Sequence, residues 1–370
     1  MGIEKTTSEN MERAYTIIRE CSSLDSQHYL SFKEDNMFFF GEKAYGMISY
    51  IIAGKKVMSI GDPVCKIEDM ECLTDEYISF CKKMGWKPIF NSVSSYMADI
   101  LAKHKFSALK YGEEAILELS GYTLAGGARA VLRRNVSRVE KSGVTLREYH
   151  PQYGRDYTLE KDIADLSDKW YAEKKYRMNY SIGSLDFDEP YDRRFFVTVD
   201  EKGNLLTFLS FLPYEGGKSF CVDIMYRKMD SMTGVMEHAI ITAAMKLKEN
   251  GASKVSLGIA PLAGIDVDKP GVRRAEKIMN AIFHNMNSDY NFKNLYRFKK
   301  KFDPTIWEPR YLVYHNKIPL VDLAISITNT KRDSADLVLY AKYKLFLIAV
   351  KLGLYKVKNK KNKGESSWKP

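Results

Sequence analysis

The residue types best suited to bind a charged ligand are concentrated in residues 289–314, which read DYNFKNLYRFKKKFDPTIWEPRYLVY. Cationic side chains alternate there with aromatic ones, and the cations are Lys293, Arg297, Lys299, Lys300, Lys301 and Arg310. A core strand does not tolerate so many charges, and a solvated face does not need so many rings. Phosphates, together with stacked bases or sugars, satisfy both kinds of group. A strand with one aromatic face and one basic face also fits the alternation, so both interpretations stay open.

A second candidate is the carboxylate of Asp223, within the apolar sequence FCVDIMYR of residues 220–227. A carboxylate in such a run is costly unless it is paired. Either Arg227 or Lys228 forms a salt bridge with it, or it holds an amino group or an attacking hydroxyl of a substrate. Its position at the end of a predicted strand, ahead of a helix, favours the functional interpretation.

Motifs for small phosphate cofactors and for metals are missing. The nearest match to a pyrophosphate loop, residues 230–235, has one glycine and lacks the expected basic residue. Neither GxGxxG nor GxxxxGK[ST] occurs. The five cysteines have no CxxC spacing and read as reduced thiols, and the chain has only six histidines. We therefore expect no cofactor and no metal, and a large donor bound over a broad basic and aromatic surface.

The elements that must position these residues recur in the same order in two halves of the chain. In the first half the patterns predict helices at 8–21, 70–84 and 97–104, and strands at 37–40, 45–53, 57–60, 88–93 and 115–119. In the second half they predict strands at 195–198, 205–213, 219–226 and 255–259 and helices at 159–174 and 234–250, with the last strands supplied by 289–314. A basic helix at 128–141 follows a linker centred on 121–127. This order predicts a mixed α/β fold.

The positive charge of the chain is concentrated in its last residues. The net charge is +10, and residues 331–370 hold 11 Lys and Arg against 3 Asp and Glu, which is +8. Residues 335–355 are strongly apolar and a polybasic run follows. This pattern predicts an interfacial helix attracted to anionic lipid, with a helix docked on the core as the alternative. No uncharged apolar run is long enough to span a membrane, and the first residues do not resemble a signal peptide.

Six ordered motifs between residues 12 and 314 resemble the catalytic domain of the phosphatidylglycerol lysyltransferases and alanyltransferases. The longest is NFKNLYRFKKKFDPTIWEPRYL at 291–312, and the others are IGDP at 60–63, GGARAVLRR at 126–134, DIM at 223–225, GVME at 234–237 and LGIAPL at 257–262. The resemblance implies two tandem acetyltransferase-like (GNAT) folds. It divides the chain into a first half at 1–120, a linker and basic helix at 121–141, a second half with the active site at 142–330, and a basic helix and tail at 331–370.

The same resemblance implies an aminoacyltransferase that uses aminoacyl-tRNA to modify phosphatidylglycerol, with lysyl as the expected group. The enzyme is expected to be cytoplasmic and peripheral at the inner face of the cell membrane, held there by its tail. The alternatives are a related transferase acting on a peptide or peptidoglycan precursor, and a membrane- or RNA-associated relative without catalysis.

Site residues are carried over from the motifs. The catalytic candidates are Asp223, Lys299, Arg310 and Tyr311; the substrate-binding candidates are Arg227, Asn291, Lys301, Trp307 and Glu308; and the tRNA-binding candidates are Arg129, Arg133, Arg134 and Arg138. Where the family has arginine after the Asp-containing motif, this chain has Tyr226. We expect Asp223 and Arg310 to line a ligand-facing cleft, so that replacing either one lowers activity and leaves the melting temperature near that of the wild type.

Overall fold

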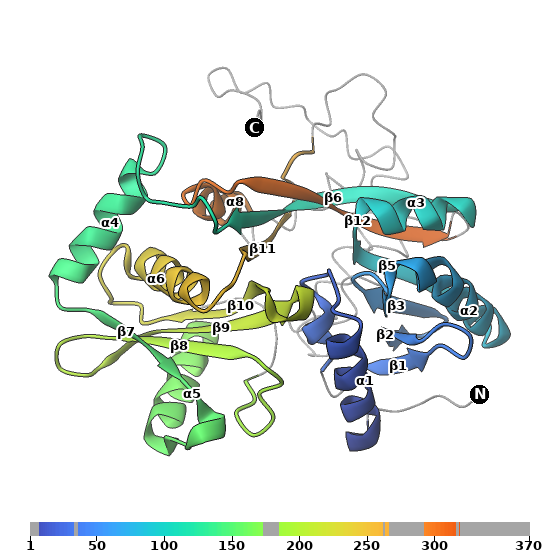
Figure 1. The fold of residues 1–370 in the computed structure, drawn as a ribbon, viewed down its shortest axis with the longest axis horizontal. Helices are drawn as coiled ribbons and strands as arrows, with labels where there is room; N and C mark the ends of the chain where they lie inside the picture. Colours follow the sequence, from blue (N-terminus) through green and yellow to red (C-terminus); the bar gives the residue numbers. More distant parts are fainter. Residues whose placement is uncertain are drawn as a thin grey trace, which may run out of the picture.

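The computed structural model describes residues 7–32, 36–172, 185–261, 263–265, 292–315 and 318 (Figure 1). Within these residues the strands form one mixed sheet of 12 strands, with helices packed against it. The mixed α/β fold expected from the sequence is confirmed. No helix in the described part of the chain is long and apolar enough to cross a bilayer. The tail at 331–370 and the interfacial helix predicted in it lie outside the described residues.

The first half begins with a capped helix, α1 (Ser8–Glu20), where the Thr7 hydroxyl accepts a hydrogen bond from the Asn10 amide. Its further helices are η1 (His28–Ser31), η2 (Ile67–Asp69), α2 (Met70–Lys83) and α3 (Ser95–Lys103). Its strands are β1 (Met37–Phe40), β2 (Gly46–Ala53), β3 (Lys56–Ile60), β4 (Val64–Cys65), β5 (Lys87–Val93) and β6 (Phe106–Glu118).

The second half repeats this alternation of strands and helices. Its helices are α4 (Ala130–Lys141), η3 (Pro151–Tyr153), α5 (Tyr157–Ala172), η4 (Glu215–Gly217), α6 (Val235–Glu249) and α8 (Phe292–Lys300). Its strands are β7 (Thr145–Tyr149), β8 (Arg194–Val199), β9 (Leu205–Tyr214), β10 (Ser219–Arg227), β11 (Lys254–Pro261) and β12 (Ile306–His315). In both halves three antiparallel strands lead to a helix and then to a strand parallel to the third, β3 with β5 and β10 with β11.

The final strands of the two halves are exchanged. β12 pairs antiparallel with both β5 and β6, and β6 pairs in turn with β11. Figure 1 shows β6 and β12 running together across both halves. Gly112 permits the approach of β6 to β11, because a Cβ at this position would lie 2.5 Å from the Ala260 carbonyl oxygen. Each half therefore completes the sheet of the other.

Hydrophobic clusters lie on both faces of the sheet. In the first half α2 and α3 cover one face, and α1 and η1 cover the other. In the second half α4 and α6 pack on one face, and α5 packs on the opposite face. The cluster under α1 also contains Leu212 of β9, so this part of the core belongs to both halves.

Two expectations about local structure are wrong. Residues 295–299 are not a strand, because they belong to α8; Leu295, Phe298 and Phe302 recur at the spacing of a helix, and the alternation of rings and cations obscures it. β6 begins at Phe106, well before the predicted strand at 115–119. The adjacent Glu113 and Glu114 interrupt its apolar pattern, and Glu114 is nevertheless fully buried.

The strand exchange predicts that residues 1–120 do not fold alone. Without β11 and β12, β5 and β6 expose long unpaired edges, and the buried apolar surface of β6 faces water. We expect residues 1–120 to lack a cooperative thermal transition by circular dichroism, and co-expression with residues 121–370 to restore one. As a control, a protease site inserted between Gly126 and Gly127, both exposed, should leave the cut protein assembled. A cooperative transition in residues 1–120 alone would contradict the prediction.

Candidate functional site

The parallel pairing of β10 with β11 stops well before either strand ends. The last paired residues are Cys221 and Ser256, and both strands carry a bulge immediately afterwards. The equivalent pair in the first half, β3 and β5, stays paired up to Ile60, where β3 ends. Ligands of open α/β sheets bind at the carboxyl ends of parallel strands, where neighbouring strands diverge. The second half therefore offers a binding position that the first half lacks.

The amino group of Lys299 lies at this position. Lys299 is only 4% exposed, and its Nζ donates a hydrogen bond of 2.7 Å to the Ile259 carbonyl of β11. Gly258 has a positive φ of 78°, and a Cβ there would lie 3.3 Å from Nζ and 3.9 Å from the Val222 carbonyl oxygen of β10. Glycine thus lets the amine sit beside both strands. Burial lowers the pKa of Lys299 to about 8.

Asp223 is half-buried in the bulge of β10. The Ser210 hydroxyl donates to its Oδ2 at 3.4 Å and accepts a hydrogen bond from the Ile224 amide, so Ser210 holds the bulged backbone in place. The strand continues to Arg227, which corrects the expectation that Asp223 ends it. The bulge nevertheless interrupts the regular pairing at Asp223, as the end of a strand would, and so leaves the carboxylate outside the regular ladder next to Val222.

Arg310 is not in an open cleft. It is 3% exposed, and its Nε donates to Glu114 Oε2 at 2.8 Å, with a second hydrogen bond from the same guanidinium to that oxygen. Asp25 lies 3.6 Å from the same guanidinium, and the Ser26 hydroxyl donates to the other Glu114 oxygen at 2.6 Å. These partners correct the expected role of Arg310 as a phosphate ligand, because the guanidinium is already used in a buried network.

The neighbours of Arg310 on β12 are divided between two environments. Glu308 is half-buried 3.5 Å from Arg310, and burial raises its pKa. Trp307 packs on the second-half core, with its ring 5.2 Å from that of Tyr296. Tyr311 packs on the first-half core. Its expected catalytic role stays a prediction.

The remaining substrate-binding candidates are dispersed. Lys301 is exposed, and its Nζ contacts Glu237 of α6 at 2.9 Å, so it holds α8 on α6 instead of facing Lys299. Arg227 is half-buried at the end of β10, opposite Thr207. Asn291 lies outside the described residues.

Three of the four arginines proposed for tRNA hold the protein together. Arg129 contacts Asp303 at 3.2 Å and stacks on Tyr122. Arg133 donates to the Leu124 carbonyl at 2.6 Å, and Arg138 donates to the Thr233 carbonyl at 2.6 Å. Arg134 is exposed and has no such bond to the residues that the structure describes. The basic stripe thus forms several clamps, and its expected role in tRNA binding stays a prediction.

The acidic members of the buried network, Asp25 and Glu114, and the buried Arg193 next to β8 are not identified by the sequence patterns. Glu114 had a signal, because a carboxylate within an apolar strand needs a cation. Its partner, however, is 196 residues away, and no local pattern identifies it.

One family model matches most of the chain. The model for "Phosphatidylglycerol lysyltransferase, C-terminal" matches residues 15–314. The chain is 26% identical over 310 residues to the phosphatidylglycerol lysyltransferase of Bacillus subtilis (strain 168), and 26% identical over 288 residues to that of Staphylococcus xylosus. These alignments cover 83% and 77% of this chain and 36% and 33% of the relatives. The chain thus spans about a third of the length of the curated relatives it matches.

Two solved structures share the fold. The structure of L-PGS from Bacillus licheniformis superposes with a TM-score of 0.76 at 23% identity, covering 88% of this chain and 96% of that chain. The C-terminal domain (DUF2156) of a putative lysylphosphatidylglycerol synthetase from Agrobacterium fabrum superposes with a TM-score of 0.74 at 25% identity, covering 88% and 97%.

The buried network predicts that Arg310→Ala destabilises the fold. Glu114 would remain buried without its cation, and we expect a loss of about 3–5 kcal/mol in the free energy of unfolding, measured in urea. The control is Arg134→Ala, an exposed arginine, for which we expect a change within about 0.5 kcal/mol. An Arg310→Ala variant as stable as the control would show that water reaches Glu114.

Burial of Lys299 predicts a pH-dependent gain in stability. Its pKa of about 8 in the folded chain is below the ordinary 10.5, so the unfolded chain binds more protons between these two pH values. The full cost of burying the ammonium is present below pH 8 and disappears as the pH rises to 10.5. Relative to Lys299→Met, the wild type should gain about 3 kcal/mol over this window.

Unfolding in urea at a series of pH values checks this expectation. Lys300→Met, which removes an exposed amine from the next residue, should run parallel to the wild type at every pH. If the free energy of unfolding of Lys299→Met has the same pH dependence as that of the wild type, the amine is solvated in the folded state.

Proposed function

The chain belongs to the phosphatidylglycerol lysyltransferase C-terminal family, and we propose on that basis that it transfers a lysyl group from aminoacyl-tRNA to phosphatidylglycerol. The transfer takes place at the inner surface of the cell membrane, which the protein contacts peripherally. The observation that carries the proposal is the placement of Asp223 and Lys299 where β10 and β11 stop pairing. A carboxylate and a buried amine there can act on an ester and an alcohol without a metal or a cofactor.

The proposed reaction needs alignment and charge stabilisation more than a protein nucleophile, because the tRNA ester is already activated. A glycerol hydroxyl of the lipid attacks the ester carbonyl. The new bond joins the glycerol oxygen to the carbonyl carbon, and the bond from that carbon to the ribose oxygen breaks. The hydroxyl proton ends on the ribose oxygen, so the reaction is balanced without another reactant.

Asp223 and Lys299 have complementary roles in this proposal. The Asp223 carboxylate accepts a hydrogen bond from the attacking hydroxyl and orients it. Lys299, mostly protonated at pH 7 with its pKa of about 8, donates to the oxyanion that develops on the ester. Burial supports this role, because a donor shielded from water stabilises a developing charge more strongly than an exposed one. Arg310 acts only indirectly, by holding β12 against β6 through Glu114.

Replacing Asp223 by Asn should abolish transfer and preserve the fold. The amide retains the shape of the carboxylate and can still accept from Ser210, so the melting temperature should stay near that of the wild type. The rate of transfer should fall about 100-fold or more, because a group that orients or accepts the reacting proton is lost. The control is Asp230→Asn, which neutralises an exposed carboxylate beyond the end of β10 and should keep full activity.

The measurement uses the full chain, tRNA charged with radiolabelled lysine, and vesicles containing phosphatidylglycerol. Label recovered in the lipid extract supports the proposal. Label found in a peptide fraction after addition of peptidoglycan precursors would replace it with the peptide-acceptor alternative. Label in neither fraction, or a fully active Asp223→Asn variant, would overturn the assignment of the site.

A further inference from the structure

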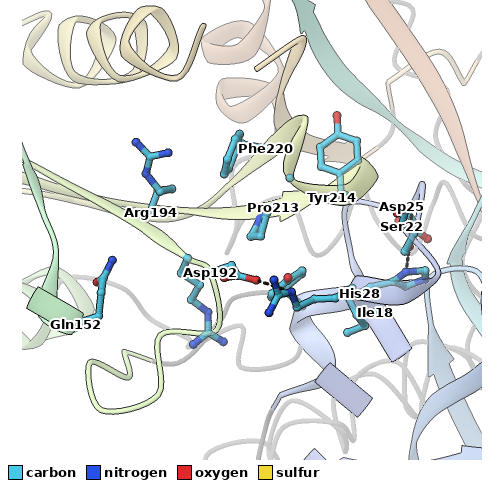
Figure 2. A pocket seen from close by; sticks show the side chains of 16 residues that line it. Ile18, Ser22, Asp25, His28, Gln152, Asp192, Arg194, Pro213, Tyr214 and Phe220 are labelled. Carbon is cyan, nitrogen blue, oxygen red and sulfur yellow. Dashed lines mark hydrogen bonds and ion pairs between the residues drawn. The ribbon is translucent and has the colours of Figure 1, made fainter. Parts of the chain in front are cut away.

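A cavity of about 480 Å³ lies between the two halves of the molecule. Its walls come from α1 and the following turn on one side and from β8 and β9 on the other, and Figure 2 shows Ile18 and His28 facing Asp192 and Pro213 around it. This volume is within the range of small-molecule sites. The cavity walls are partly apolar and partly charged, so a ligand with both characters fits best.

The unusual member of this lining is Arg193. It is 5% exposed, and within the described part of the chain its Nε has no hydrogen-bond partner. The other two arginines of the cavity wall are paired: Arg19 lies 3.7 Å from Asp192, and Arg194 contacts Glu148 with a hydrogen bond of 2.8 Å. Arg193 is therefore the cation of this wall whose charge is not neutralised by an ion pair with a described residue.

The two carboxylates of the cavity wall do not neutralise Arg193. Asp192 accepts from the Tyr15 hydroxyl at 2.7 Å, and Asp25 accepts from the backbone amides of Gln27 and Asp62. A buried charge without a partner costs several kcal/mol, so it persists only where something else requires it. An anion in the cavity would supply the guanidinium with hydrogen-bond acceptors and a negative charge. The five donors of arginine form a planar fork that matches a phosphate.

Arg193 also relates the cavity to the proposed reaction centre. Burial lowers its pKa, and among the charged groups around it Asp223 opposes this effect most strongly. Asp223 itself does not line the cavity. Arg193 is thus close enough to Asp223 for their charges to interact, while its side chain also borders the cavity.

We infer that Arg193 binds the phosphodiester of a glycerophosphate headgroup in the cavity between the halves. This inference rests on the proposed function and names where its acceptor binds. The headgroup of an anionic lipid fits the observations better than the backbone of an RNA. RNA binding neutralises several phosphates with several exposed cations, whereas this cavity offers one buried guanidinium.

The test is titration calorimetry of the full chain with sn-glycero-3-phosphoglycerol, the headgroup without its acyl chains. Arg193→Gln should bind about tenfold more weakly or worse, because charge-assisted hydrogen bonds to the phosphate are lost. Arg193→Lys should recover part of the affinity. Arg147→Gln, which removes an exposed arginine on β7, should bind like the wild type. Arg193→Gln should not lower the melting temperature, because burial disfavours the guanidinium charge more than the carboxylates around it favour it.

The outcomes separate this inference from the proposed function. Equal binding by the wild type and Arg193→Gln, or no binding by the wild type at millimolar headgroup, overturns the inference even if lysyl transfer is observed. A melting temperature lowered by several degrees in Arg193→Gln also overturns it, since Arg193 would then have a structural partner. An effect of Arg193→Gln on tRNA binding alone would assign the cavity to RNA. Arg193-dependent headgroup binding without any lysyl transfer would leave the anion site standing and remove the proposed reaction.

Discussion

The ion pair between Arg310 and Glu114 is the interaction on which the arrangement of the two halves depends. It joins neighbouring strands, β12 and β6, at the middle of the continuous sheet, where neither residue is reached by water. Removing a carboxylate and a guanidinium from water is expensive, and only a fully bonded geometry offsets that cost. A shifted register of β12 on β6 would separate the two charges. The pair therefore contributes specificity of register more clearly than it contributes net stability.

The two halves share an order of elements but differ in how far their two parallel strands stay paired. The first half keeps its parallel strands paired, whereas the second half ends that pairing early and places a buried amine beside the diverging strands. Burial disfavours the charged form of Lys299, and it does the same for Arg193 in the cavity wall. Both costs fall in or next to the second half, around Asp223. Concentration of unfavourable burial in one region is typical of a site shaped by a ligand.

Local sequence patterns predicted most of the elements and singled out Asp223, whereas Lys299 was proposed for the site through the family resemblance. Helical and strand periods are properties of a few neighbouring residues, so β1, β3, α2 and β10 could be predicted closely. The role of Arg310 could not, because its partner Glu114 is 196 residues earlier in the chain. The exchange of β6 and β12 is equally invisible, since either strand could pair within its own half. The clamps made by Arg133 and Arg138 use backbone carbonyls, which carry no residue-specific signal.

The strand exchange has a consequence for synthesis on the ribosome. A domain whose contacts are local can fold as soon as it emerges from the ribosome. Here β5 and β6 cannot pair fully until β11 and β12 have been made, much later in the chain. Until then the nascent chain exposes two unpaired edges and the unpaired carboxylate of Glu114. The order of translation thus leaves the sheet of the first half incomplete until β12, the last of the described strands, has been made.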